Sequence, residues 1–275
     1  MKPTDARRLI MDGKYSDAVK LLKTILKRNP SNVEAWILLG FTYIKLGKYN
    51  DAVDALKRAL SIDDSVVDAW INLGMAYDAL GRYNEAASAL LKAIELSPNN
   101  ARALYALGVV YSKIGRYREA IDKLKAAVKR DPEMYDAWYN LGVACERIGM
   151  YNDAVDAYRR CLKINPKDFR SWHNLGTLLT KLGRYAEALE AFKKAMEINP
   201  NNADTLFNYG VALMAVNRFK EAHEVLSKAV KMNGERGEVW FALGLALARI
   251  GRKSEALKAI VKAKELGFNV EEVLK

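Results

Sequence analysis

Apolar and small residues recur along this chain at the spacing of one face of an α-helix, and the pattern returns every 34 residues. Segment 169–202 shows the pattern clearly. Its first half aligns a tryptophan, a leucine and a glycine on one helical face; its second half aligns two alanines and a phenylalanine. A glycine separates the halves and a proline closes the segment. These residues are, in order, Trp172, Leu175, Gly176, Gly183, Ala188, Phe192, Ala195 and Pro200. The segment therefore predicts two antiparallel helices, one over about 170–182 and one from about 187 to the residue before Asn199.

The same unit repeats along nearly the whole chain. Residues 1–32 match it only in part, and we expect them to form a degenerate first repeat that acts as an N-terminal cap, with a short helix from Asp5 to Met11 capped by Thr4. Residues 271–275 are expected to begin a C-terminal capping helix. Seven full repeats lie between these ends, at 33–66, 67–100, 101–134, 135–168, 169–202, 203–236 and 237–270.

Two further features of the unit make local predictions. Asparagine stands just before the expected second helix at Asn50, Asn84 and Asn152, where it is a good helix cap. The glycine of the first helix costs about 1 kcal/mol of helix propensity relative to alanine. Its recurrence predicts that the second helix approaches closely there, at an alanine such as Ala120 or Ala188.

The order tryptophan, leucine–glycine, alanine, phenylalanine and proline over 34 residues resembles the tetratricopeptide repeat. The resemblance implies an all-α fold, a right-handed α-α superhelical solenoid of tetratricopeptide helix-turn-helix repeats. In such arrays the first helices line a concave surface, and peptides bind there. Each helix pair buries its apolar face on its neighbours, so a core can run through all repeats.

The net charge of +11 raises the question of a nucleic-acid partner. Residues 1–32 hold eight basic residues and three acids, whereas basic and acidic residues are interleaved elsewhere. A basic residue usually follows the turn glycine and an acid follows three residues later, as in Arg82 and Glu85. This spacing favours ion pairs on a solvated helix face. A solvated basic surface is therefore favoured over a nucleic-acid interface, which stays an alternative.

The chain lacks the residue patterns of an enzyme or a metal site. Cys145 and Cys161 fall at core positions of one repeat and are expected to be small buried hydrophobic residues. The two histidines, His173 and His223, lie on different repeats, and no nucleophile, phosphate-loop or zinc-protease motif occurs. We expect no enzymatic activity, no metal and no cofactor. The apolar runs are shorter than the roughly 20 residues that span a bilayer, and the N-terminus lacks a signal-peptide core, which predicts a soluble, cytoplasmic protein with no membrane partner.

The candidate binding residues lie on the first helices, on the face opposite the packing stripe. An asparagine directly precedes the glycine-containing pair in four repeats, at Asn72, Asn140, Asn174 and Asn208. An amide can donate to and accept from a peptide backbone without demanding a particular sequence. The alternative is that asparagine at this position supports its helix pair locally.

Two rows of mostly apolar residues run beside the asparagines. The first contains Ile37, Ile71, Tyr105, Tyr139, His173, Phe207 and Phe241, and the second contains Phe41, Met75, Val109, Val143, Thr177, Val211 and Leu245. Because the tryptophan–leucine–glycine face already supplies the core, a second apolar face predicts an exposed groove for an apolar or helical segment. Packing on the adjacent helix is the alternative. Arg102 and Arg170 lie at the groove edge, where they are expected to meet acidic residues of a partner.

The leading hypothesis is a non-enzymatic scaffold that binds an extended or helical peptide segment of a protein in this groove. One alternative is a basic module that binds RNA or DNA, with an affinity that falls steeply with salt. The other is a structural role through self-association, because a helix that begins after Asn269 leaves the C-terminal end open to stack on another molecule.

Overall fold

The computed structural model describes residues 2–273, and the described chain consists of helices and turns with no strand, which confirms the all-α prediction. It divides into two compact units. The first unit, Met1–Gly149, holds α1 (Pro3–Met11), α2 (Tyr15–Arg28), α3 (Val33–Lys45), α4 (Tyr49–Ile62), α5 (Val67–Ala79), α6 (Tyr83–Leu96), α7 (Ala101–Lys113), α8 (Tyr117–Arg130) and α9 (Tyr135–Arg147). The second unit, Met150–Lys275, holds α10 (Tyr151–Ile164), α11 (Phe169–Lys181), α12 (Tyr185–Ile198), α13 (Ala203–Ala215), α14 (Phe219–Met232), α15 (Gly237–Arg249), α16 (Lys253–Glu265) and α17 (Val270–Val273).

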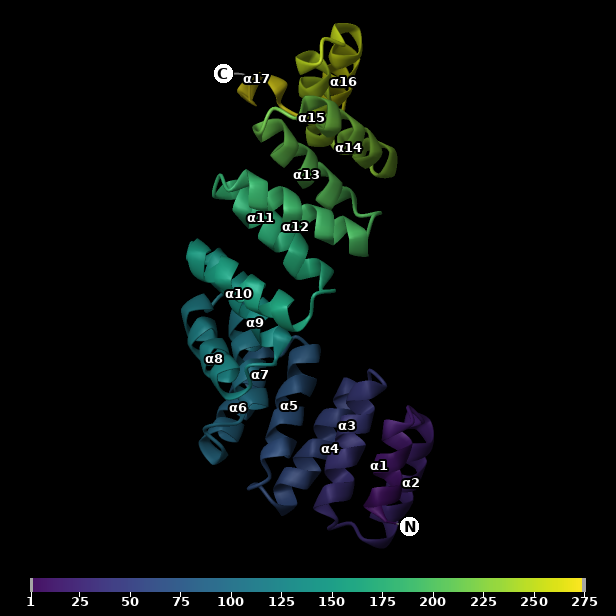
Figure 1. Ribbon diagram of the computed structural model, residues 1–275. Helices are drawn as coiled ribbons and strands as arrows, with labels where there is room; N and C mark the ends of the chain where they lie inside the picture. Colours follow the sequence, from purple (N-terminus) through teal and green to yellow (C-terminus); the bar gives the residue numbers. More distant parts are fainter. Residues whose placement is uncertain (1, 274–275) are drawn as a thin grey trace. The chain divides into compact units, whose positions relative to one another are not determined.

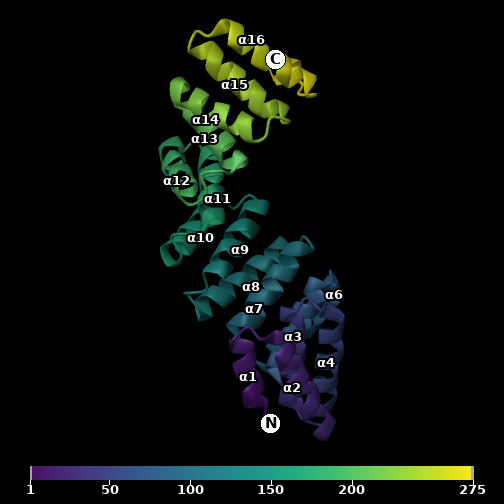
Figure 2. The same cartoon turned by 90° about the vertical axis from the view of Figure 1, so that its right-hand side faces the viewer.

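In the first unit, helices that follow one another along the chain pack as antiparallel pairs, as Figures 1 and 2 show. The pairs are α3 with α4, α5 with α6 and α7 with α8, and each second helix also packs on the first helix of the next pair. The first helices of neighbouring pairs, α3, α5, α7 and α9, touch one another in turn. They therefore form one continuous layer, and the candidate binding residues of this unit belong to that layer.

The second unit repeats this arrangement. Its pairs are α11 with α12, α13 with α14 and α15 with α16, and the first helices α11, α13 and α15 contact one another in order. The unit boundary after Gly149 falls inside the predicted fourth repeat, 135–168. The predictions for Met1 and for Leu274 and Lys275 lie outside the described residues.

The two helices of a pair come close together at the glycine of the first helix. A Cβ added to Gly108 would lie 2.7 Å from Cγ of Leu124 and 3.3 Å from the carbonyl oxygen of Ala120. The sequence correctly predicted close approach at this glycine. However, the side chain that fills the space belongs to Leu124, one turn beyond the expected alanine. Only a residue without a Cβ leaves room for that leucine.

The turns and caps differ in part from expectation. The turn glycines have positive φ, and Asn217 takes the same conformation with φ 60°, which asparagine tolerates better than most residues. The expected caps Asn50, Asn84 and Asn152 lie inside the first turn of their helices, because those helices begin one residue earlier, at a tyrosine. Side-chain caps occur instead at first helices, where Asn32, Asn100, Asp168 and Asn202 accept a backbone N–H.

The first helix also begins earlier than predicted. Helix α1 starts at Pro3 rather than Asp5, because proline fits the first helical position, where its missing N–H has no partner to lose. Asp5 accepts a hydrogen bond from the backbone nitrogen of Lys2 at 2.9 Å. Cys145 and Cys161 are buried, as predicted. Among residues 2–273, every helix is too short or too polar to span a bilayer.

Candidate functional site

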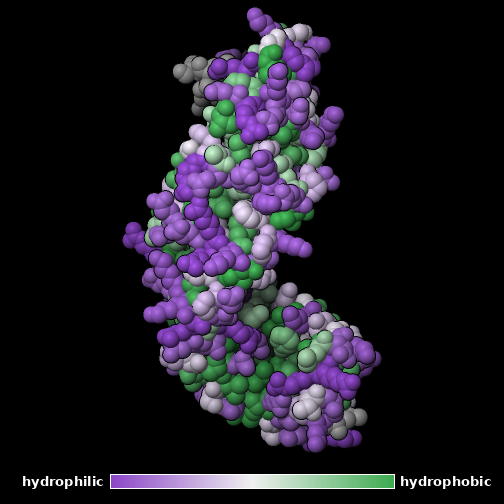
Figure 3. All heavy atoms as spheres, in the orientation of Figure 1, coloured by the Kyte–Doolittle hydropathy of each residue, from purple (hydrophilic) through white to green (hydrophobic). Residues whose placement is uncertain are grey.

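The layer of first helices in the first unit carries a cavity of about 390 Å³. Its floor is apolar and includes Ile71, Met75, Tyr105 and Val109 from α5 and α7. Figure 3 shows hydrophobic atoms gathered over α5 and its neighbours. Charged residues at the rim come from three successive first helices, α5, α7 and α9: Asp78, Arg102 and Asp136. The predicted apolar row is thus exposed here in part, and it forms a recess between α5 and α7.

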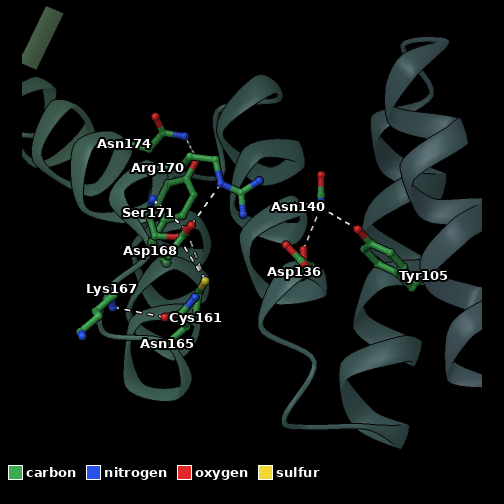
Figure 4. A network of polar contacts seen from close by, with 11 residues as sticks. Tyr105, Asp136, Asn140, Cys161, Asn165, Lys167, Asp168, Arg170, Ser171 and Asn174 are labelled. Atoms are coloured by element: carbon green, nitrogen blue, oxygen red, sulfur yellow. Dashed lines mark hydrogen bonds and ion pairs between the residues drawn. The ribbon is translucent and has the colours of Figure 1, made fainter. Parts of the chain in front are cut away.

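Asn140 lies beside this cavity, and its amide has a defined orientation (Figure 4). Its Nδ2 donates to the backbone oxygen of Asp136 at 2.8 Å and to the hydroxyl of Tyr105 at 3.5 Å. Because a carbonyl oxygen can only accept, the nitrogen must face Asp136, and Oδ1 points the other way. Asp136 and Tyr105 both line the cavity. The Asn140 nitrogen is therefore engaged within the protein, and Oδ1 is turned away from Asp136 and Tyr105.

Asn208 of the second unit is oriented by a hydrogen bond to a threonine hydroxyl. The Thr177 hydroxyl donates to the backbone oxygen of His173 at 3.1 Å, so its lone pair accepts from Nδ2 of Asn208 at 3.2 Å. Asn174 differs, since its Nδ2 points to the hydroxyl of Tyr158 at 3.4 Å on helix α10. Identical residues at one repeat position thus meet different neighbours, and only local contacts decide which atom faces outward.

His173 belongs to a polar cluster rather than to an apolar row. The Thr205 hydroxyl donates to Oδ1 of Asn202 at 2.8 Å, so it accepts from Nδ1 of His173, also at 2.8 Å. The imidazole packs edge-on against Phe192, with ring centroids 6.4 Å apart. The His173 position, apolar or aromatic in the other full repeats, is therefore polar in the second unit, where it hydrogen-bonds to Thr205.

Three predicted site residues are buried. Ile71, Asn72 and Phe241 are each at most 5% exposed. In the first predicted apolar row, by contrast, the side chains of Tyr105, Tyr139 and Phe207 are partly exposed. Oδ1 of Asn72 is enclosed and meets no hydrogen-bond donor among residues 2–273. A buried acceptor without a partner costs stability, so Asn72 weakens the first unit.

Replacing Asn72 with leucine is expected to raise the free energy of unfolding by about 1–2 kcal/mol, because the unpaired acceptor is removed. Leucine fits this position, since Leu38 occupies it, largely buried, in the preceding repeat. Urea unfolding followed by far-ultraviolet circular dichroism measures the change. Asn140→Leu is the matched control and should bring no gain, because that amide makes two hydrogen bonds. A loss of stability in Asn72→Leu would contradict the assignment.

The two candidate arginines are engaged in ion pairs. Nη1 of Arg102 lies 3.1 Å from Oδ1 of Asp68, and Nε of Arg170 lies 3.1 Å from Oδ1 of Asp168. The Arg102 pair is more than half exposed on both sides, and such pairs contribute at most about 1 kcal/mol. A partner's carboxylate could therefore exchange with Asp68 at little cost.

A network around Asp168 was not found from the sequence. The Asp168 carboxylate accepts from the backbone N–H of Ser171 at 3.1 Å and from its hydroxyl at 2.6 Å, and the Ser171 hydroxyl lies 3.1 Å from Sγ of Cys161 (Figure 4). Most repeats have alanine where Cys161 and Ser171 stand, and this departure was the available signal. The network fixes the start of α11, which is a structural role.

Crevices on the second-helix side were also missed. Three cavities of about 430, 650 and 610 Å³ lie beside Trp36, Trp70 and Trp172, and each is lined by basic and acidic residues of flanking second helices. The first two have lining residues that correspond at intervals of 34 positions. The sequence assigned these tryptophans to packing alone. The crevices are a regular product of the repeat.

The surface charges follow the predicted spacing. Arginine and glutamate three residues apart form ion pairs at Arg82–Glu85, Arg116–Glu119, Arg184–Glu187, Arg218–Glu221 and Arg252–Glu255. The hydrogen bond from the arginine lowers the pKa of each of these glutamates. Burial raises the pKa of Tyr209. The shifted glutamates belong to surface ion pairs, and these pKa shifts do not mark a pair of catalytic acid and base.

Comparison with known families and structures agrees with this geometry. The family model of the cytochrome c-type biogenesis protein H TPR domain matches residues 17–126 and 157–262, and a tetratricopeptide repeat model matches residues 105–169. No curated protein matches the sequence.

Solved structures share the fold. YrrB, described as a TPR protein with an unusual peptide-binding site, superposes with a TM-score of 0.63 at 26% identity, over 68% of this chain and 96% of YrrB. MamA superposes with a TM-score of 0.54 at 31% identity, over 59% of this chain and 95% of MamA. Pseudomonas aeruginosa pilF gives a TM-score of 0.62 at 21% identity, over 78% and 99% of the two chains, and supports the fold alone. The predicted tetratricopeptide solenoid is confirmed.

Proposed function

Since this chain belongs to the tetratricopeptide-repeat family, we propose that it is a non-enzymatic scaffold whose first-helix layer binds a peptide segment of another protein. Scaffolds of this family are generally non-enzymatic, and the likeness to YrrB, described as having a peptide-binding site, supports a protein-interaction scaffold in general. The cytoplasmic location stays a prediction from the sequence.

The observation that carries the proposal is the cavity beside Asn140 in the first unit. Its apolar floor takes one large apolar side chain of a peptide, and burial of such a side chain is favourable by about 1.5–3 kcal/mol. Oδ1 of Asn140, turned away from Asp136 and Tyr105, accepts a backbone N–H of the same peptide. Arg102 releases Asp68 and pairs instead with an acidic residue of the peptide, which favours peptides that carry an acid at this place. The other predicted contacts, Asn174, Asn208, Tyr139, His173, Phe207 and Arg170, stay predictions.

A peptide selected from a random phage-displayed library on the full chain provides the probe, and fluorescence anisotropy measures its binding. Met75→Asp is expected to weaken binding by about tenfold or more, because it places a charge against the apolar side chain of the peptide. Met75 is 38% exposed, so the change should leave the fold intact.

Val211→Asp is the matched control. Val211 occupies the same repeat position on α13, in the second unit, and is 36% exposed. It should bind the selected peptide as the wild type does. Equal binding by wild type, Met75→Asp and Val211→Asp would contradict a site at this cavity. Asn140→Ala is a separate test: it should bind the peptide more weakly than the wild type, because the acceptor oxygen is removed.

Nucleic-acid binding is the weaker candidate. Many basic side chains of the described surface already have acidic neighbours, as the arginine–glutamate pairs show. A basic interface would give an affinity for RNA or DNA that falls steeply as salt rises. Binding of labelled RNA at low salt with a flat salt response, or no binding, would remove this alternative.

A further inference from the structure

Helix α16 carries a stripe of four exposed residues spaced four apart: Lys253, Leu257, Val261 and Glu265. Residues at this spacing form a ridge on one side of a helix. Leu257 is 64% exposed and Val261 is 48% exposed, which is unusual for neighbouring aliphatic residues. The following segment, Phe268 and Val270, packs against Phe241 and Ala263 and leaves the ridge uncovered. The α16 ridge is thus basic at one end, apolar in the middle and acidic at the other end.

The preceding repeats show that this ridge departs from their pattern. The residues equivalent to Leu257 are buried in five repeats, at Val53, Ala87, Ile121, Val155 and Leu189, and partly buried at Val19. The position of Val261 is polar in most repeats, with Lys57, Lys125, Arg159, Lys193 and Ser227, and only Leu91 is also apolar. Lys253 stands where most other repeats have tyrosine or phenylalanine. The two changed residues, Lys253 and Val261, and the exposed Leu257 fall on one ridge.

We propose that the α16 ridge pairs with the same ridge of a second copy of this chain, antiparallel and about a twofold axis. Such an interface must be self-complementary. In antiparallel register, Leu257 of one copy lies against Val261 of the other, and Lys253 lies against Glu265. Both ends of the ridge then gain an opposite charge, and the apolar centre leaves water. Glu265 already pairs with Lys262 at 3.1 Å, but both side chains are about half exposed and free to rearrange.

Stacking of the C-terminal end on the N-terminal end fits less well. Helix α1 exposes Arg8 at the repeat position where Ala76, Ala144 and Ala246 are buried against a neighbouring helix. Placing the apolar ridge of α16 against this arginine would bury a charge without a partner. The N-terminal face therefore favours water, and the twofold arrangement is the one that matches apolar with apolar surface.

Sedimentation velocity of the full chain over a wide concentration range tests the pairing. We expect a reversible monomer–dimer equilibrium that stops at the dimer, because a twofold contact closes on itself. A single-helix ridge is small, so the dissociation constant should lie in the micromolar range or above. A monomer at every concentration, or growth beyond the dimer without limit, would overturn the proposal.

Variants distinguish this interface from others. Leu257→Asp with Val261→Asp should weaken dimerisation by about tenfold or more, because it buries charges at the centre of the contact. Leu91→Asp is the matched control, since Leu91 has the repeat position of Val261 on α6 and is also exposed, and it should dimerise like the wild type. An unchanged equilibrium in the double variant would reject the ridge.

A charge exchange gives a result that misfolding cannot imitate. Lys253→Glu alone and Glu265→Lys alone each place like charges opposite one another and should weaken the dimer. The two changes together restore opposite charges across the axis and should recover the wild-type equilibrium. Failure of the double exchange to recover it would rule out the antiparallel register.

Discussion

Replacing Phe192 with alanine is expected to lower the free energy of unfolding by about 4 kcal/mol. Phe192 is fully buried in α12, and its ring lies against Gly176 of α11, where an added Cβ would be 2.7 Å from Cε1. The ring also contacts His173 and Tyr209, with centroids 6.4 and 6.2 Å away. Truncation leaves a cavity that rigid helices on both sides cannot fill. Urea unfolding followed by far-ultraviolet circular dichroism measures the loss.

Ile198→Ala on the same helix is the control, because Ile198 is exposed and its truncation should cost less than about 0.5 kcal/mol. Similar losses for both variants would show that the unfolding signal does not report on core packing. A small loss for Phe192→Ala would show that α11 and α12 close over the space.

Replacing Gly108 with leucine is the second large effect, and we expect a loss of about 3 kcal/mol from overpacking. An added Cβ meets Cγ of Leu124 at 2.7 Å and a backbone oxygen of Ala120 at 3.3 Å, so α7 and α8 must separate. The gain in helix propensity over glycine, about 1 kcal/mol, is smaller than this cost. Differential scanning calorimetry should show a lower melting temperature.

Gly115→Asn is the control for that variant. Gly115 has φ +80° and no atom within 4 Å of its added Cβ, and Asn217 adopts the same conformation in the sixth repeat. The change should therefore cost less than about 1 kcal/mol. If Gly108→Leu were as mild as Gly115→Asn, the close approach of α7 and α8 would not be needed for stability.

Helix positions were predicted well because they depend on local chemistry. Glycine at the turns and the apolar face of each helix act over a few residues, so a 34-residue repetition identifies them. Helix starts were predicted less well. Asn50 is a good cap in isolation, yet α4 begins at Tyr49 after Lys48, because the turn and the packing of the pair set the first residue.

The candidate site was predicted as a surface but not as a set of contacts. Met75 and Val109 were placed on the groove face, and both line the cavity of the first unit. Asn72 and Asn140 share one repeat position, yet one is enclosed without a donor and the other is held by Tyr105 and Asp136. Asp136 lies only four positions before Asn140, but Tyr105 lies 35 positions away on the preceding first helix, which the pattern of a single helix does not specify.

The 34-residue repetition specifies the helices, their pairing and the family, because a repeating unit buries its apolar face against a copy of itself. Which residues of the second face stay open depends on contacts between repeats. In the folded chain Ile71 and Phe241 are buried, a cavity lies beside Tyr105, and the Asn140 nitrogen is held against Asp136. Leu257 is exposed on α16, whereas five earlier repeats bury the same position. Periodicity gives the direction of a side chain, whereas its exposure depends on the size and chemistry of neighbours one repeat away.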